Sequence, residues 1–195
     1  MNSTNPFIYS DDNKRYHTLN YYNKSSFNSK VFKAVIDAGF TCPNKDGTKG
    51  TGGCIYCMGG SGYFTEKSDG EIYDSVKRQL AAEKERIYKK HPDSLITAYF
   101  QANTNTYAPV ATLKEAYTAA LDFGVHGISI GTRADCLPDD VIALLCDINN
   151  KTHLTVELGL QTIHDKSAQI INRCYTYDEF LEGYRKLQES GIRTC

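Results

Sequence analysis

The first thirty residues contain no apolar stretch of the kind that a signal peptide or a membrane-spanning segment requires, and they are instead polar and rich in Asn, Ser and Tyr. The chain also lacks an excess of one charge, because 22 Lys and Arg face 23 Asp and Glu, for a formal net charge of −1. The first absence predicts a cytoplasmic protein without a membrane partner. The second weakens, without excluding, a nucleic-acid substrate, because no strongly basic surface is expected.

No linker, repeat or low-complexity segment interrupts the sequence, so we expect one domain. The 195 residues are 41% hydrophobic and 23% charged, which is ordinary for a globular protein. We assign residues 1–30 to a polar N-terminal extension and residues 31–195 to the folded core.

Strand-like runs and helical periods alternate along the core. Two pairs of residues are spaced as capping boxes, Thr112 with Glu115 and Thr176 with Glu179, and each is expected to open a helix. The expected strands are residues 30–40, 95–100, 125–131 and 153–160, with a fifth beginning at 192–195, and the expected helices are residues 71–90, 112–124, 139–149 and 176–191.

Strand–helix units at this spacing predict an α/β fold with a parallel sheet, either doubly wound or curved into a barrel. In both architectures ligands bind at the carboxyl ends of the strands. The polar and cysteine-containing segments of this chain all follow expected strands, so we expect them to meet at that edge of the sheet.

Three cysteines, Cys42, Cys54 and Cys57, lie in a glycine-rich stretch directly after the first expected strand. Eleven residues separate the first two and two residues separate the last two, so three soft thiolates share one loop, which predicts a metal site. A structural zinc site needs four protein ligands, whereas a 4Fe–4S cluster held by three cysteines keeps one iron free for a further molecule.

The cysteines alone leave zinc and an iron–sulfur cluster equally open. The absent signal peptide and the close spacing of the last two cysteines favour metal ligation over disulfides. A fourth zinc ligand could come from residues elsewhere in the chain, namely His17, His91, His126 or Cys136.

The stretch DAGFTCPNKDGTKGTGGCIYC resembles the radical S-adenosylmethionine (SAM) superfamily, and within it uncharacterised bacterial proteins related to the radical-SAM region of the Elongator catalytic subunit. The eleven-residue first gap is a mark of this subgroup, and the resemblance runs from about Arg15 to the last residue. It implies a parallel, partial (β/α)6 barrel with a 4Fe–4S cluster on Cys42, Cys54 and Cys57 at its open top.

The resemblance also implies a reaction. SAM would chelate the free iron, and an electron from a flavodoxin- or ferredoxin-type donor would cleave SAM to a 5′-deoxyadenosyl radical that abstracts hydrogen from the substrate. RNA and a small molecule both stay open as substrates. From a different class of function, a zinc-binding structural or interaction protein is the alternative.

Four residues of the first three strand ends match SAM-binding positions of the superfamily. Tyr56 lies where these enzymes use an aromatic residue to contact adenine, although loop packing would also explain it. Gln101 and Asn105 match positions that anchor the SAM amino group, although their polar stretch could be a solvated loop. The segment GTRAD, which contains Thr132, resembles a SAM-contacting segment, although its arginine could simply pair with its own aspartate.

The segment VELGLQTIHDKSAQIINR resembles a piece of oxygen-independent coproporphyrinogen oxidase in which a glutamine and an arginine hold SAM. The corresponding residues are Gln161 and Arg173, and an arginine fork suits a carboxylate partner. After Arg173 the chain has Cys174 and Tyr175 where relatives commonly have a small residue and a histidine, so no role of that histidine transfers. Because the chain stops as the fifth strand begins, we expect a barrel truncated after about four βα units.

Overall fold

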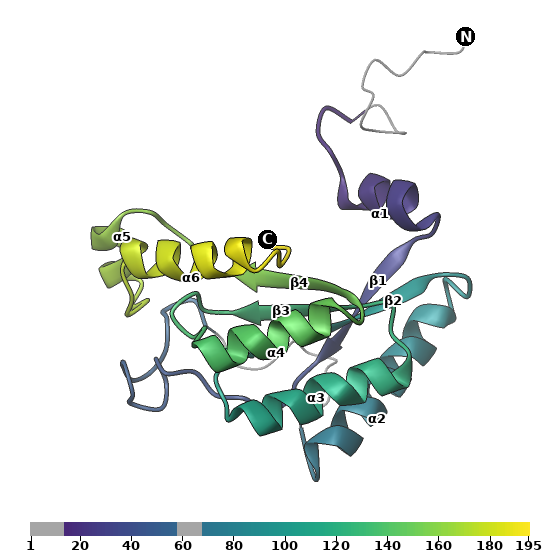
Figure 1. Ribbon diagram of the computed structural model, residues 1–195, viewed down its shortest axis with the longest axis horizontal. Coiled ribbons are helices and arrows are strands. Elements are labelled where there is room, and N and C mark those ends of the chain that lie inside the picture. The colour runs from purple at the N-terminus through teal and green to yellow at the C-terminus, as the bar shows by residue number, and fades with distance from the viewer. Residues whose placement is uncertain (1–13, 58–67) are drawn as a thin grey trace.

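Four parallel strands form one sheet in the order β1-β2-β3-β4 in a computed structural model that describes residues 14–57 and 68–195 (Figure 1). The start of the expected N-terminal extension and the residues directly after Cys57 lie outside the described residues. The strands are β1 (Val31–Ile36), β2 (Leu95–Phe100), β3 (Gly127–Thr132) and β4 (His153–Leu158), and the helices are α1 (Leu19–Phe27), α2 (Ile72–Tyr88), α3 (Val110–Phe123), α4 (Asp139–Asn149), α5 (Asp165–Ile170) and α6 (Tyr177–Glu189).

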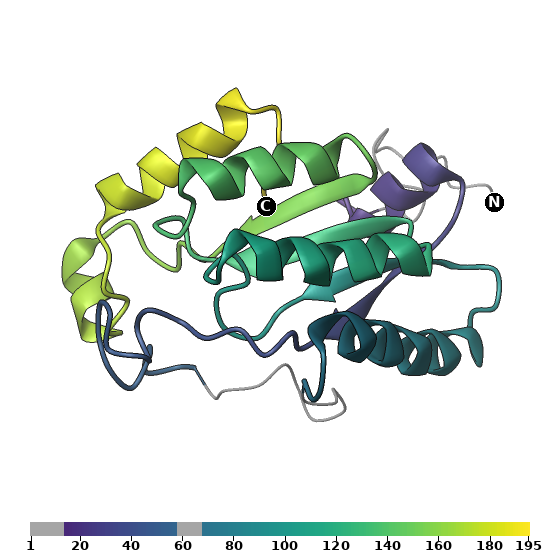
Figure 2. The same ribbon diagram turned by 60° about the horizontal axis from the view of Figure 1, so that its bottom comes forward.

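The strand order decides between the two architectures that the sequence left open. Each strand pairs with the next strand along the chain, and α2, α3 and α4 cover the same face of the sheet (Figure 2). A doubly wound sheet would reverse its strand order and carry helices on both faces. The fold is therefore α/β with a four-stranded parallel sheet, consistent with part of a radical-SAM (β/α) barrel.

The two faces of the sheet differ in chemistry. Towards the helices the strands present apolar residues that form the buried core, such as Ala34, Phe100, Ile128 and Val156. The alternate positions face the other way and are largely polar, namely Lys33, Thr97, Tyr99, Ser129, Thr155 and Glu157. Most parallel sheets are apolar on both faces. The polar face here adjoins the open side of the curved sheet and extends towards the carboxyl ends of the strands.

Most expected elements are present, and the differences have local causes. Helix α3 begins at Val110 with Pro109 as its cap, so the capping box expected at Thr112 is wrong, because the proline already starts the helix one turn earlier. The capping box of Thr176 and Glu179 is confirmed at α6. Helices α1 and α5 were not expected, because both are short and lack a long apolar period.

Residues after α6 pair with β4, as expected for the beginning of a fifth strand. The backbone N–H groups of Val156 and Leu158 donate to the carbonyls of Arg193 and Cys195, each at 2.9 Å. Thr194 forms a parallel bridge with Val156. Among the described helices, none combines the length and the hydropathy that crossing a bilayer would need.

Helix α6 approaches the segment after β3 so closely that only glycine fits at Gly183. A β-carbon there would lie 2.0 Å from the carbonyl oxygen of Ala134. We therefore expect Gly183→Ala to lower the free energy of unfolding by about 2–3 kcal/mol despite the better helix propensity of alanine, because overpacking against backbone cannot relax. Urea denaturation measures this, and Glu182→Ala, an exposed neighbour, is the matched control. Equal stabilities of the two variants would contradict the close packing.

Candidate functional site

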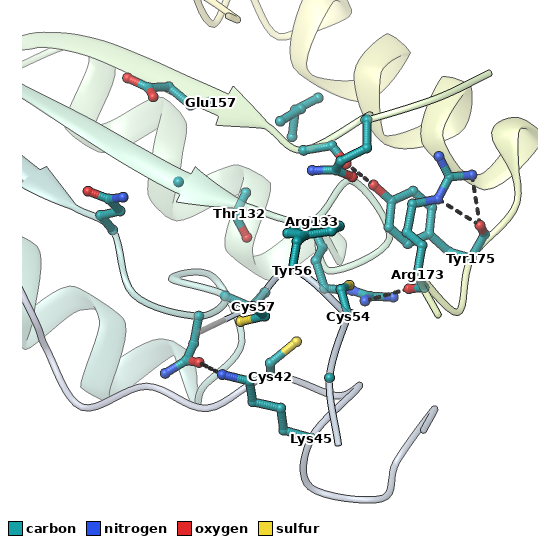
Figure 3. Close-up of a pocket in the computed structure, with 18 of the residues that line it drawn as sticks. Cys42, Lys45, Cys54, Tyr56, Cys57, Thr132, Arg133, Glu157, Arg173 and Tyr175 are labelled. Atoms are coloured by element: carbon teal, nitrogen blue, oxygen red, sulfur yellow. Dashed lines mark hydrogen bonds between the residues drawn. The ribbon is translucent and has the colours of Figure 1, made fainter. Parts of the chain in front are cut away.

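A cavity of about 420 Å³ lies at the carboxyl-terminal edge of the sheet, where residues 42–57, which we call the cysteine loop, meet the segments after β2, β3 and β4 (Figure 3). Eight of the nine residues that the sequence predicted as metal or SAM ligands line this cavity. They are Cys42, Cys54, Tyr56, Cys57, Gln101, Thr132, Gln161 and Arg173. Residues from four separate segments of the sequence therefore meet where ligands bind in parallel α/β folds.

The residues between the first two cysteines fold into a small hairpin. Asp46 and Thr51 form an antiparallel bridge, and the N–H group of Gly53 donates to the carbonyl of Asn44 at 2.8 Å. The hairpin brings the chain back on itself, so that Cys42 and Cys54 line the same cavity although eleven residues separate them in sequence. All three cysteines can therefore face one cavity.

A buried asparagine joins the cysteine loop to the segment that follows α5. The side chain of Asn44 is fully buried, and its Nδ2 donates to the carbonyl of Asn172 and lies 3.5 Å from Sγ of Cys54. In return, Nδ2 of Asn172 donates to the carbonyl of Gly53 at 2.8 Å. These reciprocal contacts hold the end of the hairpin next to Cys54.

The chemistry of the three thiols fits an iron–sulfur cluster. Cys57 is exposed, Cys42 and Cys54 are half-buried, and none of them forms a disulfide. Soft thiolates without accompanying histidines are the ligands that such clusters take. Within residues 14–57 and 68–195, no three His, Cys, Asp or Glu side chains are already close enough to hold a metal ion. The thiols thus share a cavity and would draw together around a ligand.

None of the residues considered as a fourth zinc ligand lines this cavity. His91 and His126 precede β2 and β3, at the opposite edge of the sheet, and each packs against a phenylalanine ring. His17 lies beside α1, with its ring next to that of Tyr21. Cys136 is buried near the cysteine loop, and burial raises the pKa of its thiol to about 12. Among the described residues, the cavity lining therefore contains three cysteines and none of these four candidates.

Three of the predicted SAM-binding side chains are accessible from the cavity. Tyr56 is 49% exposed, and Gln101 and Gln161 are exposed near the beginnings of the segments that follow β2 and β4. Gln161 has a left-handed backbone, with φ of 57°, which turns the chain at the rim. Thr132 is buried, and its hydroxyl lies 2.6 Å from that of Thr106, so it forms part of the wall.

Asn105 does not line the cavity, in contrast to its predicted contact with the SAM amino group. Its side chain is 1% exposed, and Nδ2 donates to the carbonyls of Gly131 at 2.9 Å and Ala102 at 3.0 Å. These bonds fasten the polar segment after β2 to the end of β3. Spacing alone could not distinguish this residue from Gln101, because both follow the same strand.

Arg173 lines the cavity, but its guanidinium is 1% exposed and is occupied by the backbone. Nη1 donates to the carbonyls of Leu160 at 2.6 Å and Thr162 at 2.7 Å, and Nε and Nη2 both donate to that of Tyr175, at 3.1 and 2.9 Å. The fork that the sequence assigned to a SAM carboxylate therefore has carbonyl partners within the chain. It stabilises the turn that carries Gln161.

Two residues of the cavity lining to which the sequence assigned no role, Tyr99 and Glu157, form a polar group with Lys33. Lys33 pairs with Glu157, and its ammonium lies 4.0 Å from the centre of the Tyr99 ring. The Tyr99 hydroxyl donates to Oε2 of Glu157 at 3.0 Å. Burial and then the Glu157 carboxylate raise the pKa of Tyr99, so the phenol stays protonated. Each of these residues lies on the polar face of its strand. The alternation of polar and apolar residues along each strand is the sequence signal that could have identified them.

A buried ion pair joins Arg133 of the cavity wall to Asp135. Nε and Nη2 of Arg133 donate to the two carboxylate oxygens of Asp135, each at 2.8 Å, which confirms the pairing considered from the sequence. Lys49 of the cysteine loop also reaches Asp135, at 2.7 Å. Burial alone would raise the pKa of Asp135, but the hydrogen bonds from Arg133 and Lys49 outweigh it and hold that pKa below its usual value.

The sequentially ordered parallel sheet, its outer layer of helices and a thiol-lined cavity at the carboxyl ends of the strands define an α/β barrel-type protein with a ligand site at its open end. Comparison with protein families agrees, since residues 45–195 match the radical SAM superfamily. The chain belongs to the radical SAM superfamily.

Three curated proteins are similar to this chain in sequence. The chain is 48% identical over 197 residues to "Uncharacterized protein YtqA" of Bacillus subtilis, covering 100% of the chain and 60% of that protein. It is 35% identical over 171 residues to "Protein YhcC" of Escherichia coli K12, covering 87% and 53%, and 33% identical over 181 residues to "Uncharacterized protein MJ0486" of Methanocaldococcus jannaschii, covering 89% and 53%. The chain thus spans between about half and three fifths of these relatives.

Proposed function

We propose that this chain is the radical-SAM core of an enzyme in which Cys42, Cys54 and Cys57 hold a 4Fe–4S cluster and SAM occupies the adjoining cavity. The observation that carries the proposal is the convergence of the three thiols with Tyr56 and Gln101 in one cavity at the open end of the sheet. Membership of the radical SAM superfamily supports it independently.

The bound cluster would supply the electron for reductive cleavage of SAM to a 5′-deoxyadenosyl radical. The residues of this chain bind and orient SAM. The exposed ring of Tyr56, between two of the ligands, offers an aromatic face for adenine, and the side-chain amides of Gln101 and Gln161 offer hydrogen-bond partners on two other sides. Thr132 contributes to the wall, and Arg173 acts through the turn that it stabilises.

The wider setting belongs to the same proposal. Seven free cysteines suit a reducing compartment, which supports a cytoplasmic location and an electron donor of the flavodoxin or ferredoxin type. The residues from position 31 onwards form the core of the enzyme, with residues 1–30 as an extension. The eleven-residue gap between the first two cysteines supports the kinship with the Elongator catalytic subunit.

The substrate is either RNA or a small molecule. The near-neutral net charge of the chain does not by itself favour RNA over a small molecule. The alternative function, a zinc-binding structural protein, receives less support, because none of the four residues considered as a fourth zinc ligand lines the cavity.

Metal analysis of the protein tests the proposal directly. After anaerobic purification and reconstitution, we expect about four iron and four sulfide per chain, brown colour, and release of 5′-deoxyadenosine from SAM under dithionite. A Cys42→Ala protein treated in the same way is the matched control for adventitious iron. A colourless protein that retains zinc through the same procedure would instead establish the structural alternative.

A further inference from the structure

One lysine ties the hairpin of the cysteine loop to the body of the protein. Lys49 lies between Cys42 and Cys54 in sequence, and its ammonium is 2.7 Å from Oδ2 of Asp135 and 3.1 Å from Oε1 of Glu179. The Lys49 side chain is 34% exposed, whereas that of Asp135 is 3% exposed. The contact with Asp135 is therefore shielded from solvent at one end and is the stronger of the two.

Asp135 is in turn held in place by the core of the cavity wall. Its carboxylate accepts two hydrogen bonds from Arg133, and Nη1 of Arg133 donates to the carbonyl of Arg173 at 2.9 Å. The chain of contacts runs from the hairpin, through the end of β3, to the segment after α5. The hairpin and the segment after α5 flank the same cavity.

The second partner of Lys49 belongs to α6. Glu179 occupies the third position of that helix, where its other oxygen accepts from the N–H group of Thr176 at 2.7 Å. The capping box orients this carboxylate independently of its contact with Lys49. The hairpin is thus held on one side by a buried carboxylate and on the other by a helix terminus.

We infer that Lys49 is a positioning residue for the cluster ligands: its ion pair with Asp135 holds the hairpin so that Cys42 and Cys54 face one cavity. Lys49 is not a ligand and does not line the cavity. The inference rests on the proposed function, because it concerns how the chain presents thiols to a cluster. It adds that an ion pair outside the cavity governs how firmly the cluster is kept.

The pattern of contacts makes Lys49→Met a clean test. Asp135 keeps both hydrogen bonds from Arg133 after the substitution, so no buried charge loses its last partner and the fold is expected to persist. The hydrogen bonds of Lys45 with Asn103 and of Thr48 with Tyr107 also remain, so the substitution removes one of several contacts between the hairpin and the rest of the protein. Lys49→Arg restores a cation with similar reach and is expected to rescue.

Two measurements follow the loop and the cluster separately. In the metal-free protein, hydrogen exchange of a peptide covering residues 43–53 is expected to be on the order of tenfold faster in Lys49→Met, because one charge-assisted contact is lost. In the reconstituted protein, iron release to a ferrous chelator, followed by visible absorbance, is also expected to be roughly tenfold faster.

Matched variants separate the tether from a general effect of charge. Lys151→Met removes an exposed lysine at the opposite edge of the sheet and is expected to match wild type in both measurements. Glu179→Gln keeps the capping box but removes the weaker partner, so we expect about a threefold effect. If Lys49→Met does not fold, Glu179→Gln replaces it in both measurements.

The possible outcomes distinguish the two claims. A wild-type protein that takes up no iron refutes the proposed function, and with it this inference. A wild-type protein that takes up iron, together with wild-type exchange or wild-type iron release in Lys49→Met, overturns the inference alone. If Lys49→Arg did not restore wild-type exchange and iron release, the inference would also be overturned, because arginine supplies the cation and the reach to which the inference assigns the effect.

Discussion

Cys54→Ala is expected to lose the brown chromophore and nearly all bound iron after anaerobic reconstitution. Three thiolates are the smallest set that holds a 4Fe–4S cluster while leaving one iron open, and two would leave half of its irons without a protein ligand. The same result is expected for Cys42→Ala and Cys57→Ala, because all three thiols line the same cavity. Iron and sulfide analysis with visible absorbance measures the loss.

Cys146→Ala is the control for this series. Cys146 lies on α4, packs against the apolar core and does not line the cavity, so we expect full iron content. Full iron content in Cys54→Ala would refute the ligand assignment. Iron loss in Cys146→Ala as well would show that the chromophore reports the integrity of the fold and not the ligands.

Arg173→Ala is expected to lower the free energy of unfolding of the metal-free protein by about 3–5 kcal/mol. The guanidinium is buried and satisfies three backbone carbonyls, which alanine would leave without donors. The turn after β4 that carries Gln161 is expected to loosen at the same time. Urea denaturation measures the loss without any cluster or SAM.

Arg185→Ala, which removes an exposed arginine from α6, is expected to change stability by less than about 0.5 kcal/mol and is the matched control. Arg173→Lys is expected to recover only part of the loss, since an ammonium cannot reproduce the fork. Unchanged unfolding of Arg173→Ala, combined with weaker SAM binding after reconstitution, would instead support the direct SAM contact that the sequence predicts.

The elements with strong local signals were predicted well. β2 and α4 have the expected bounds, and α6 begins at its capping box, because alternation, helical period and capping depend on neighbouring residues. The predicted start of α3 at Thr112 was wrong because two helix-start signals lie close together in sequence. The helix begins directly after Pro109, which precedes Thr112 by three residues. The short helix α5 has no period long enough to detect.

The candidate ligands of the cysteine loop were also predictable, because they are three residues of one type close together in sequence. Which of the surrounding residues face the cavity was less predictable. Gln101 and Asn105 follow the same strand four residues apart, yet one is exposed at the rim and the other is buried beneath it. Burial depends on the segment that packs from the next strand, which lies far away in sequence.

By itself the sequence determined the parallel α/β class and the loop that gathers three thiols, because both follow from residue periodicity and local spacing. Only the tertiary structure decided that Arg173 bonds to the backbone, that Lys33 pairs with Tyr99 and Glu157 of the cavity lining, and that Lys49 of the hairpin pairs with Asp135. Each of these depends on side chains from separate strands meeting at one edge of the sheet, and a charged side chain pairs with whatever lies within a few ångströms of it, however distant in sequence.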